Sequence, residues 1–352
     1  MKIANKLISQ NSSTYFIADI AANHDGDIER AKDLIYLSAE SGADAAKFQH
    51  FKAKSIVSDF GFKNLGSQSS HQSSWEKSVF EVYEDASVDL SWTQELKDTC
   101  EKANITFFTT PYDLAIVDFI NNFVPAFKIG SGDITWHEII EKVASLGKPY
   151  LIATGASSLD EVMVCIEKAL KINDNLCLMQ CNTNYTASLE NFKYINLNVL
   201  KTYKTIYPDI LLGLSDHTPG HATVLGAVAL GAKIIEKHFT DDNERKGPDH
   251  RFSMNPKSWK EMVSRTRELD NALGNGIKKV EKNEYETVIL QRRAIRASCD
   301  LKLGTLISDK NTFPLRPCPK DGIPPFKIKE ISGKLLNKNI REGDIIRFSD
   351  ID

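Results

Sequence analysis

Short apolar segments alternate with amphipathic segments along most of the chain. The apolar segments predict strands at residues 15–20, 44–49, 106–110, 126–131, 150–154, 176–182, 211–216 and 234–239. Helical periodicity lies between them, at residues 28–41, 91–104, 114–122, 135–147, 158–172, 190–206, 221–231 and 257–273. Strands that are apolar on both faces are typical of a parallel sheet covered by helices. Eight such strand–helix units predict a TIM (β/α)8 barrel.

An open, doubly wound sheet is the alternative α/β architecture. It is disfavoured because no glycine-rich dinucleotide loop follows the first strand. The second connection, residues 51–90, is a long serine-rich segment that includes His71, Trp75 and Phe80. A long loop inside a compact fold is usually functional or mobile.

The C-terminal part of the chain departs from the barrel pattern. We expect the barrel to occupy residues 1–274, because Gly274-Asn275-Gly276 follows its last helix. The charged stretch at residues 275–290 is expected to be a linker. Residues 291–352 contain short β-like pieces separated by turns, so they predict a small, separate, β-rich domain.

The composition gives no indication of a nucleic-acid or membrane partner. The net charge is −3, and no apolar run approaches the roughly 18 residues of a membrane helix. The first residues lack the apolar core of a signal peptide. The six cysteines show no zinc-binding spacing, and scattered cysteines suggest reduced thiols in a cytoplasmic protein.

A pair of histidines suggests a metal site. His217 and His238 end the seventh and eighth predicted strands, and a small-residue helix lies between the two strands. Parallel strands joined by a crossover helix end at the same edge of the sheet, where two imidazoles can share a divalent metal. A single histidine at a strand end is more often a packed or hydrogen-bonded residue. The hypothesis therefore depends on the matching positions of the two.

Polar residues follow all eight predicted strands, where a TIM barrel has its active site. In chain order they are Asp19, Asn23 and His24; Lys47 and Gln49; Thr109 and Thr110; Lys128, Ser131 and Asp133; Thr154; Asn182, Thr183 and Tyr185; Ser215, Asp216 and His217; and His238.

Two lysines, Lys47 and Lys128, lie within otherwise apolar strands. A buried ammonium group without an anionic partner is costly. The partner is either a structural carboxylate or an anionic group of the substrate, such as a phosphate or carboxylate, and the histidine pair favours the substrate. A Schiff-base aldolase is a weaker alternative, because such an enzyme does not need the histidine pair.

Several motifs together resemble the sialic acid (nonulosonate) synthase family. They are Phe16-Ile-Ala-Asp-Ile-Ala-Ala-Asn-His-Asp-Gly26, Lys47-Phe-Gln49, Phe127-Lys-Ile-Gly-Ser-Gly132, Gly213-Leu-Ser-Asp-His-Thr218 and Glu236-Lys-His-Phe239. The C-terminal stretch, with Arg316-Pro317 and Gly343-Asp-Ile-Ile346, resembles the antifreeze-like (SAF, β-clip) domain that these enzymes carry.

The resemblance implies a transferase reaction of the N-acetylneuraminate synthase type. Phosphoenolpyruvate condenses with the open-chain aldehyde of an N-acetylated amino sugar, giving a nine-carbon 2-keto sugar acid and phosphate with cleavage of a C–O bond. A divalent metal, commonly Mn²⁺ but also Mg²⁺ or Co²⁺, is expected on His217 and His238. Arg316 is expected to reach the partner subunit's site in a domain-swapped homodimer.

The resemblance also assigns roles to single positions of this sequence. The expected catalytic residues are Asp19, Lys47, Lys128 and Asp133. The expected substrate-binding residues are Asn23, Gln49, Thr110, Ser131, Asn182, Thr183, Tyr185, Ser215, Asp249 and Arg316.

Three departures from the family pattern bear on the acceptor sugar. Asp19 and Asp133 stand where glutamate is common, and residues 181–186 read Cys-Asn-Thr-Asn-Tyr-Thr in place of Cys-Thr-x-x-Tyr-Pro. N-acetylmannosamine and a 2,4-diacetamido-6-deoxy sugar, the acceptor type of legionaminate and pseudaminate synthases, both remain possible. A non-catalytic carbohydrate-binding barrel is a more distant alternative, against which the intact histidines and lysines argue.

Overall fold

The computed structural model describes the whole chain except residues 67–71, 73 and 74, so His71 lies outside the described residues. The chain divides into two compact units, Met1–Gly274 and Asn275–Asp352. Among the described helices, none combines the length and the apolar character that crossing a membrane requires.

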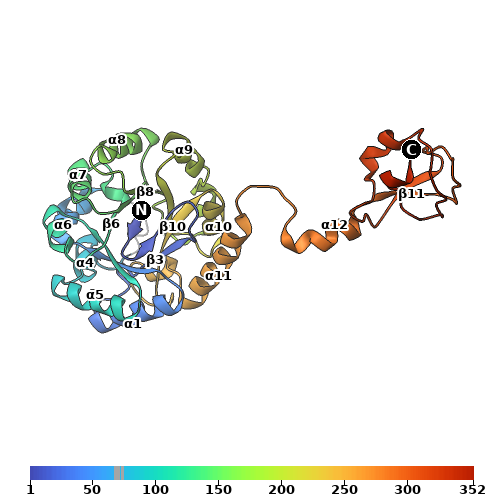
Figure 1. Cartoon of the computed structure of the whole chain (residues 1–352). Coiled ribbons are helices and arrows are strands. Elements are labelled where there is room, and N and C mark those ends of the chain that lie inside the picture. Colours follow the sequence, from blue (N-terminus) through green and yellow to red (C-terminus); the bar gives the residue numbers. More distant parts are fainter. Residues whose placement is uncertain (67–71, 73–74) are drawn as a thin grey trace. The chain divides into compact units, whose positions relative to one another are not determined.

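Eight parallel strands, all within the described residues, form the centre of the larger unit (Figure 1). They are β3 (Tyr15–Asp19), β4 (Ala45–His50), β5 (Thr106–Pro111), β6 (Phe127–Ile129), β7 (Tyr150–Ala153), β8 (Leu176–Cys181), β9 (Leu211–Asp216) and β10 (Ala232–His238). Their hydrogen-bonded order is β5-β4-β3-β10-β9-β8-β7-β6, and β5 and β6 also lie next to each other. The predicted TIM barrel and its strands are confirmed.

A ring of helices covers the outside of the strands (Figure 1). It contains α1 (Ile28–Glu40), α5 (Thr93–Lys102), α6 (Leu114–Ile120), α7 (His137–Ser145), α8 (Leu159–Leu170), α9 (Val199–Ile206), α10 (Ala222–Ala229) and α11 (Pro256–Leu273). The prediction of one helix at residues 190–206 is wrong. Gln180 binds the backbone oxygen of Ile195 at 2.9 Å, and Asn196 has a positive φ, so the segment divides into η4 (Leu189–Tyr194) and α9.

Alternate residues of each strand face different cores. One core lies inside the barrel of strands and includes Ile17, Phe108 and Met179. The other lies between strands and helices and includes Phe16 and Leu178. Side chains alternate between the two faces of a strand. A polar residue near a strand end therefore faces the barrel interior only if an even number of positions separates it from the inner-core residues of that strand.

The amino end of the barrel carries a hairpin that the sequence did not predict. It consists of β1 (Lys2–Ile3) and β2 (Lys6–Leu7), which pair antiparallel. Ile3 and Ile8 are buried in the inner core, so the hairpin closes this end of the barrel.

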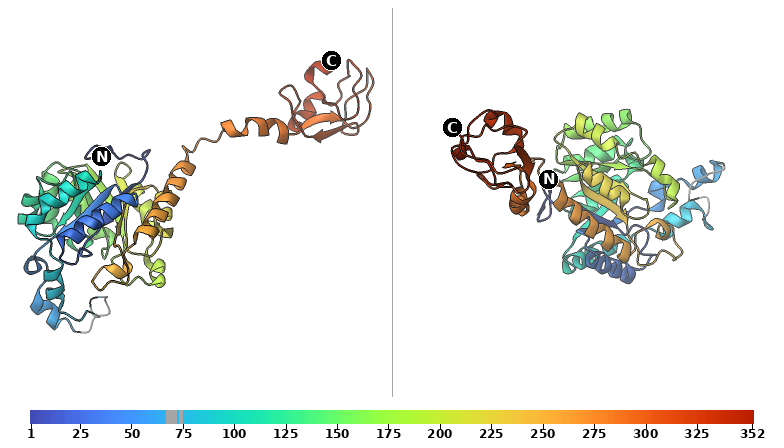
Figure 2. Two further views of the ribbon diagram at one scale, coloured as in Figure 1. Left: turned by 90° about the horizontal axis from the view of Figure 1, so that it is seen from below. Right: turned by 90° about the vertical axis from the view of Figure 1, so that its right-hand side faces the viewer.

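The connection at residues 51–90, expected as a loop, contains short helices. They are α2 (Ala53–Ile56), α3 (Asp59–Asn64), α4 (Val79–Asp85) and η2 (Leu90–Trp92). These elements follow β4, so they stand at the carboxyl end of the barrel. Figure 2 shows them at the end opposite the N-terminus.

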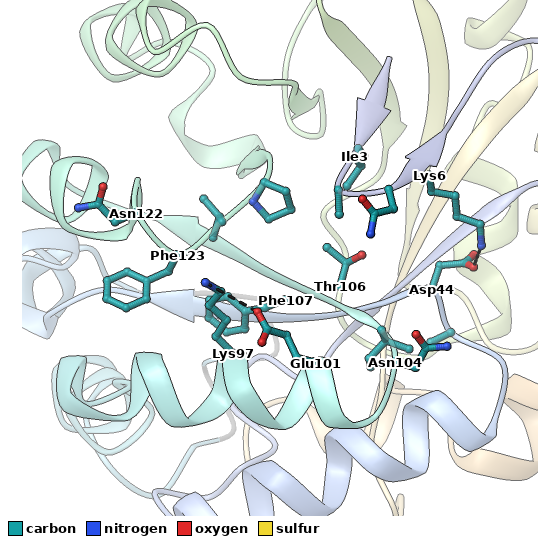
Figure 3. A pocket seen from close by; sticks show the side chains of 16 residues that line it. Ile3, Lys6, Asp44, Lys97, Glu101, Asn104, Thr106, Phe107, Asn122 and Phe123 are labelled. Atoms are coloured by element: carbon teal, nitrogen blue, oxygen red, sulfur yellow. Dashed lines mark hydrogen bonds and ion pairs between the residues drawn. The ribbon is translucent and has the colours of Figure 1, made fainter.

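A cavity of about 750 Å³ lies at the amino end, beside the hairpin (Figure 3). Its charged lining residues are Lys6, Asp44, Lys97 and Glu101. They are paired with one another, Lys6 with Asp44 and Lys97 with Glu101. This cavity is therefore separate from the polar residues at the carboxyl ends of the strands.

The smaller unit has its own apolar core, which includes Ile295, Ile307, Ile331 and Ile346. Its antiparallel pair is β11 (Ala294–Ala297) and β12 (Thr312–Leu315), accompanied by η7 (Pro325–Lys327), α13 (Ile328–Ile331) and η8 (Phe348–Asp350). The stretch expected to be a linker contains η6 (Lys282–Glu284) and most of α12 (Tyr285–Gln291).

The packing of the barrel interior predicts that Gly213→Ala destabilises the larger unit. A Cβ at this position would lie 2.8 Å from the Ile234 backbone oxygen and 3.0 Å from Met179 Cγ. We expect a loss of about 1–3 kcal/mol in the free energy of unfolding, measured by thermal denaturation. Gly132→Ala is the control, because a Cβ there meets nothing within 4 Å. Equal melting temperatures for the two variants would contradict the prediction.

Candidate active site

Strand register brings three predicted site residues into one row. His238 of β10 is opposite Asp19 of β3, and Asp19 is opposite Lys47 of β4. Asp19 Oδ2 lies 2.6 Å from Lys47 Nζ and 3.6 Å from His238 Nε2. It also accepts a hydrogen bond of 3.2 Å from Gln49 Nε2. One carboxylate oxygen therefore joins the predicted metal-binding and anion-binding residues.

The two histidines lie side by side, with ring centroids 5.3 Å apart. Burial lowers the pKa of each to about 3, and mutual repulsion adds to the effect at His217. Both rings are therefore neutral near pH 7, which is the state that binds metals.

Hydrogen bonding decides which nitrogen of each histidine can bind a ligand. His217 Nδ1 donates to the backbone oxygen of Asn182 at 2.9 Å, which leaves a lone pair on Nε2. His238 Nδ1 is buried without a hydrogen-bond partner, and Asp249 Oδ2 lies 3.8 Å from it. The ring of Phe252 packs 4.8 Å from that of His238.

Each buried lysine has a carboxylate partner inside the barrel. Lys128 Nζ lies 3.1 Å from Glu236 Oε1, and Lys47 Nζ lies 3.9 Å from the same oxygen. Burial opposes ionisation, but Lys128 and Lys47 hold the pKa of Glu236 at about 2. The sequence favoured a substrate anion as the partner of the two lysines. In the structure, the carboxylates of Asp19 and Glu236 already neutralise part of their charge.

Glu236 is a site residue that the sequence analysis missed. It is 4% exposed, accepts a hydrogen bond of 3.1 Å from Ser215 Oγ, and has a second carboxylate oxygen without a hydrogen-bond partner. The sequence did contain an indication of it. Glu236 is an acidic residue in an apolar strand, two positions before His238 and therefore on the same face.

The predicted hydroxyl residues make different contacts, one with a lysine and two with Gly155. Thr110 Oγ1 accepts a hydrogen bond of 3.3 Å from Lys47 Nζ. Ser131 Oγ accepts one of 2.9 Å from the amide of Gly155. A Cβ on Gly155 would lie 2.5 Å from Thr183 Cγ2 and 3.0 Å from Ser131 Oγ. Only glycine at position 155 therefore allows the side chains of Ser131 and Thr183 to pack this closely against its backbone.

Two carboxyl groups have pKa values close to neutral pH. Burial raises the pKa of Asp133 and of Asp249 to about 6. Asp133 belongs to η3 (Ser131–Asp133), and its Oδ2 is buried without a hydrogen-bond partner. Asp249 accepts a hydrogen bond of 3.2 Å from the amide of Ala22.

The remaining predicted residues differ in their placement. The ring of Tyr185 packs 4.4 Å from that of His217. Asn182 contributes its backbone oxygen to His217, while its side chain donates to the Tyr194 backbone oxygen at 3.3 Å.

Asn23 is fully buried away from the lysines, with its amide hydrogens on Phe239 O and Ser253 Oγ. Its expected contact with substrate stays a prediction. Arg316 is exposed, directly after β12 of the smaller unit.

The donor set fits a divalent metal held by two histidines and further ligands from outside the protein. In the described residues no group of three or more His, Cys, Asp and Glu side chains is arranged to hold an ion. The two imidazoles are neutral and adjacent, and Nδ1 of His238 is buried without a hydrogen-bond partner. Catalytic metals keep positions open for water and substrate, which a small set of protein ligands allows.

A barrel with this row of residues at its carboxyl end belongs to a known class. The sequence matches the NeuB family over residues 34–278 and the SAF domain over residues 292–352. The chain is a member of the NeuB family, so the predicted resemblance and the predicted C-terminal domain are confirmed.

Individual relatives are similar over nearly the whole chain. The N,N'-diacetyllegionaminic acid synthase of Campylobacter jejuni is 36% identical, with 95% of this chain and 99% of the relative covered. The N-acetylneuraminate-9-phosphate synthase of Homo sapiens is 32% identical, with 94% and 91% covered. The crystal structure of N-acetylneuraminic acid (sialic acid) synthetase from Leptospira borgpetersenii has a TM-score of 0.71 and 28% identity, with 82% of this chain and 94% of that chain covered.

The raised pKa of Asp133 predicts a pH-dependent effect of Asp133→Asn on stability. The folded protein favours the protonated carboxyl group, so this contribution is complete below about pH 4 and is lost as the pH rises through about 6. The variant should match the wild type near pH 4 and exceed its free energy of unfolding by up to about 3 kcal/mol near pH 7.5. Thermal denaturation at both pH values tests this. Asp33→Asn, on the exposed surface of α1, is the control, and the same change in both variants would contradict the prediction.

Proposed function

We propose that this protein condenses phosphoenolpyruvate with an N-acetylated amino sugar to form a nine-carbon 2-keto sugar acid and phosphate. The observation that supports the proposal best is the position of Asp19 Oδ2 between His238 and Lys47. A neutral imidazole pair and a lysine pair thereby share one buried site. The histidine pair suits a metal that binds the carbonyl group of the acceptor, and the lysine pair suits the anionic donor. The reaction needs these two groups of residues next to each other.

The charges of the site support a role for a divalent cation, with Mn²⁺ as the first choice and Mg²⁺ or Co²⁺ as alternatives. Lys47 and Lys128 are balanced by Asp19 and Glu236, so Asp133 and Asp249 add negative charge once they ionise. Binding of an anionic donor in such a site requires additional positive charge. When bound by His217 and His238, the cation supplies Lewis acidity at the carbonyl oxygen of the acceptor.

The protein's own residues bind and orient the donor. Lys47 and Lys128 attract its phosphate and carboxylate groups, and the hydroxyl groups of Thr110, Ser131 and Ser215 add hydrogen bonds. Carbon 3 of the donor attacks the carbonyl carbon, water adds to carbon 2, and phosphate leaves with the bridging oxygen. Asp133, next to Ser131 and with a pKa of about 6, is suited to accept a proton from this water.

The proposed reaction predicts phosphate release that depends on a metal. The protein should release phosphate from phosphoenolpyruvate with Mn²⁺ and either N-acetylmannosamine or a 2,4-diacetamido-6-deoxy sugar, and the faster of the two sugars identifies the acceptor class. Chelation should abolish turnover, and His217→Ala should reduce it at least about 100-fold. His137→Ala, on the exposed side of α7, is the control. Full activity after exhaustive chelation would exclude the metal, and no phosphate release with any sugar would contradict the reaction.

We further propose that Arg316 serves the site of the partner subunit in a homodimer. Arg316 is a basic, exposed residue of a unit that follows a connecting segment, and the donor requires positive charge beyond the balanced lysines. A symmetric dimer allows each smaller unit to complete the other subunit's site. The capping unit would also exclude water from the reaction.

Mixed dimers test this exchange. Arg316→Ala and His217→Ala should each be nearly inactive alone. After co-expression, random pairing makes about half of the dimers mixed, each with one intact site of two, so activity should recover to about a quarter of wild type. Arg341→Ala, another exposed arginine of the smaller unit, should keep full activity. Demonstrated mixed dimers without recovery would show that Arg316 does not act across the interface.

A further inference from the structure

Three aromatic side chains form a cluster at the carboxyl end of the barrel, with tilted and edge-to-face ring contacts. This aromatic rim consists of Phe51, which follows β4, Tyr112, which follows β5, and Tyr83 of α4. The ring of Phe51 lies 5.4 Å from that of Tyr83 and 5.8 Å from that of Tyr112. The rim therefore connects the inserted helix α4 with the ends of two barrel strands.

Tyr112 locates the rim beside the candidate active site. Its hydroxyl oxygen lies 3.2 Å from the position that a Cβ would take on Gly130, the residue before Ser131. Burial raises the pKa of Tyr112, and the negative charges of Asp133 and Asp19 add to the effect. The inner edge of the rim thus borders the segment after β6, within electrostatic reach of Asp19.

Tyr83 connects to this region through its ring contact with Phe51. Burial raises its pKa, and the carboxylates of Asp249 and Asp133 add to the effect. These two carboxylates come from different sides of the barrel, one after β10 and one after β6, so Tyr83 lies within electrostatic reach of both.

The position of α4 is fixed at both of its ends. Ser78 and Glu81 form a capping box at its start. At its end, the backbone oxygen of Asp85 lies 3.6 Å from the Cβ position of Gly26, in the loop after β3. Tyr83 is therefore held in place by contacts on either side of it and by Phe51.

We propose that Tyr83 is a specificity-determining residue of the acceptor pocket, with its ring packed against carbon-bound hydrogens and the acetamido methyl group of the sugar. This inference rests on the proposed function. Aromatic faces next to carboxylates suit a sugar, because the rings cover its apolar face and the carboxylates accept bonds from its hydroxyl groups. Of these carboxylates, Asp249 has the larger effect on the pKa of Tyr83 and lies 3.8 Å from His238, where the proposed function places the acceptor, so we expect Tyr83 to serve the acceptor rather than the donor.

The kinetics of phosphate release test the proposal. Tyr83→Leu keeps an apolar side chain but removes the flat ring, and we expect it to raise the KM for the acceptor about 10-fold. The KM for phosphoenolpyruvate should stay within about twofold of wild type. Tyr83→Phe should behave as the wild type, because the ring and not the hydroxyl makes the contact. Tyr36→Ala, at an exposed tyrosine of α1, is the control for general effects.

Each outcome separates this inference from the proposed function. An active wild type with an unchanged acceptor KM in Tyr83→Leu would overturn the role of Tyr83 and leave the reaction intact. Equal increases in both KM values would show a structural role only, and would also overturn it. A wild type that releases no phosphate with any acceptor would contradict the proposed function itself, whatever the variants do.

Discussion

The burial of two lysine side chains inside the barrel is the constraint on which the candidate site depends. An ammonium group that leaves water costs several kcal/mol unless a carboxylate accompanies it. Lys47 and Lys128 are 2% and 3% exposed, so Asp19 and Glu236 have to be inside as well. These four charges occupy the region above the apolar inner core. Any further charge in the site, from substrate or metal, has to be accommodated by this balanced set.

A second buried ion pair lies on the outer face of β9 and β10. Lys237 contacts Asp216, and Thr218 and Thr223 bind the same carboxylate. Asp216 and Lys237 alternate along β9 and β10 with Ser215 and Glu236, which face the interior. A slip of one residue in either strand would exchange the two sets and leave several charges unpaired. The outer pair therefore helps to fix the register that aligns the two histidines.

The sequence predicted the barrel and most of the site because both follow from alternation. Parallel strands end at one edge, so His217 and His238, at matching strand ends, were expected to meet, and their rings do lie 5.3 Å apart. Glu236 was missed because it lies inside a predicted strand and not at its end. Its spacing of two residues from His238, which places both side chains on one face, was not considered.

The hairpin β1–β2 and helix α4 were also missed, for a different reason. Short elements of this kind are stable only through tertiary contacts, such as those of Ile3 with the inner core and of Tyr83 with Phe51. Local patterns do not contain that information.

The departures at Asp19 and Asp133 and the aromatic rim concern the same part of the molecule. Aspartate is one methylene shorter than the glutamate common in the family, so both carboxylates end nearer to their own strands. Asp19 is in addition held by Lys47 at 2.6 Å. Tyr112 lies within electrostatic reach of both carboxylates, and Tyr83 of Asp133. Space that longer acidic side chains would fill is thus bordered by aromatic rings. In the proposed function, this exchange keeps both carboxylates but draws them back toward their strands, so aromatic rings form more of the wall of the acceptor pocket, while the histidines and lysines stay as in the family.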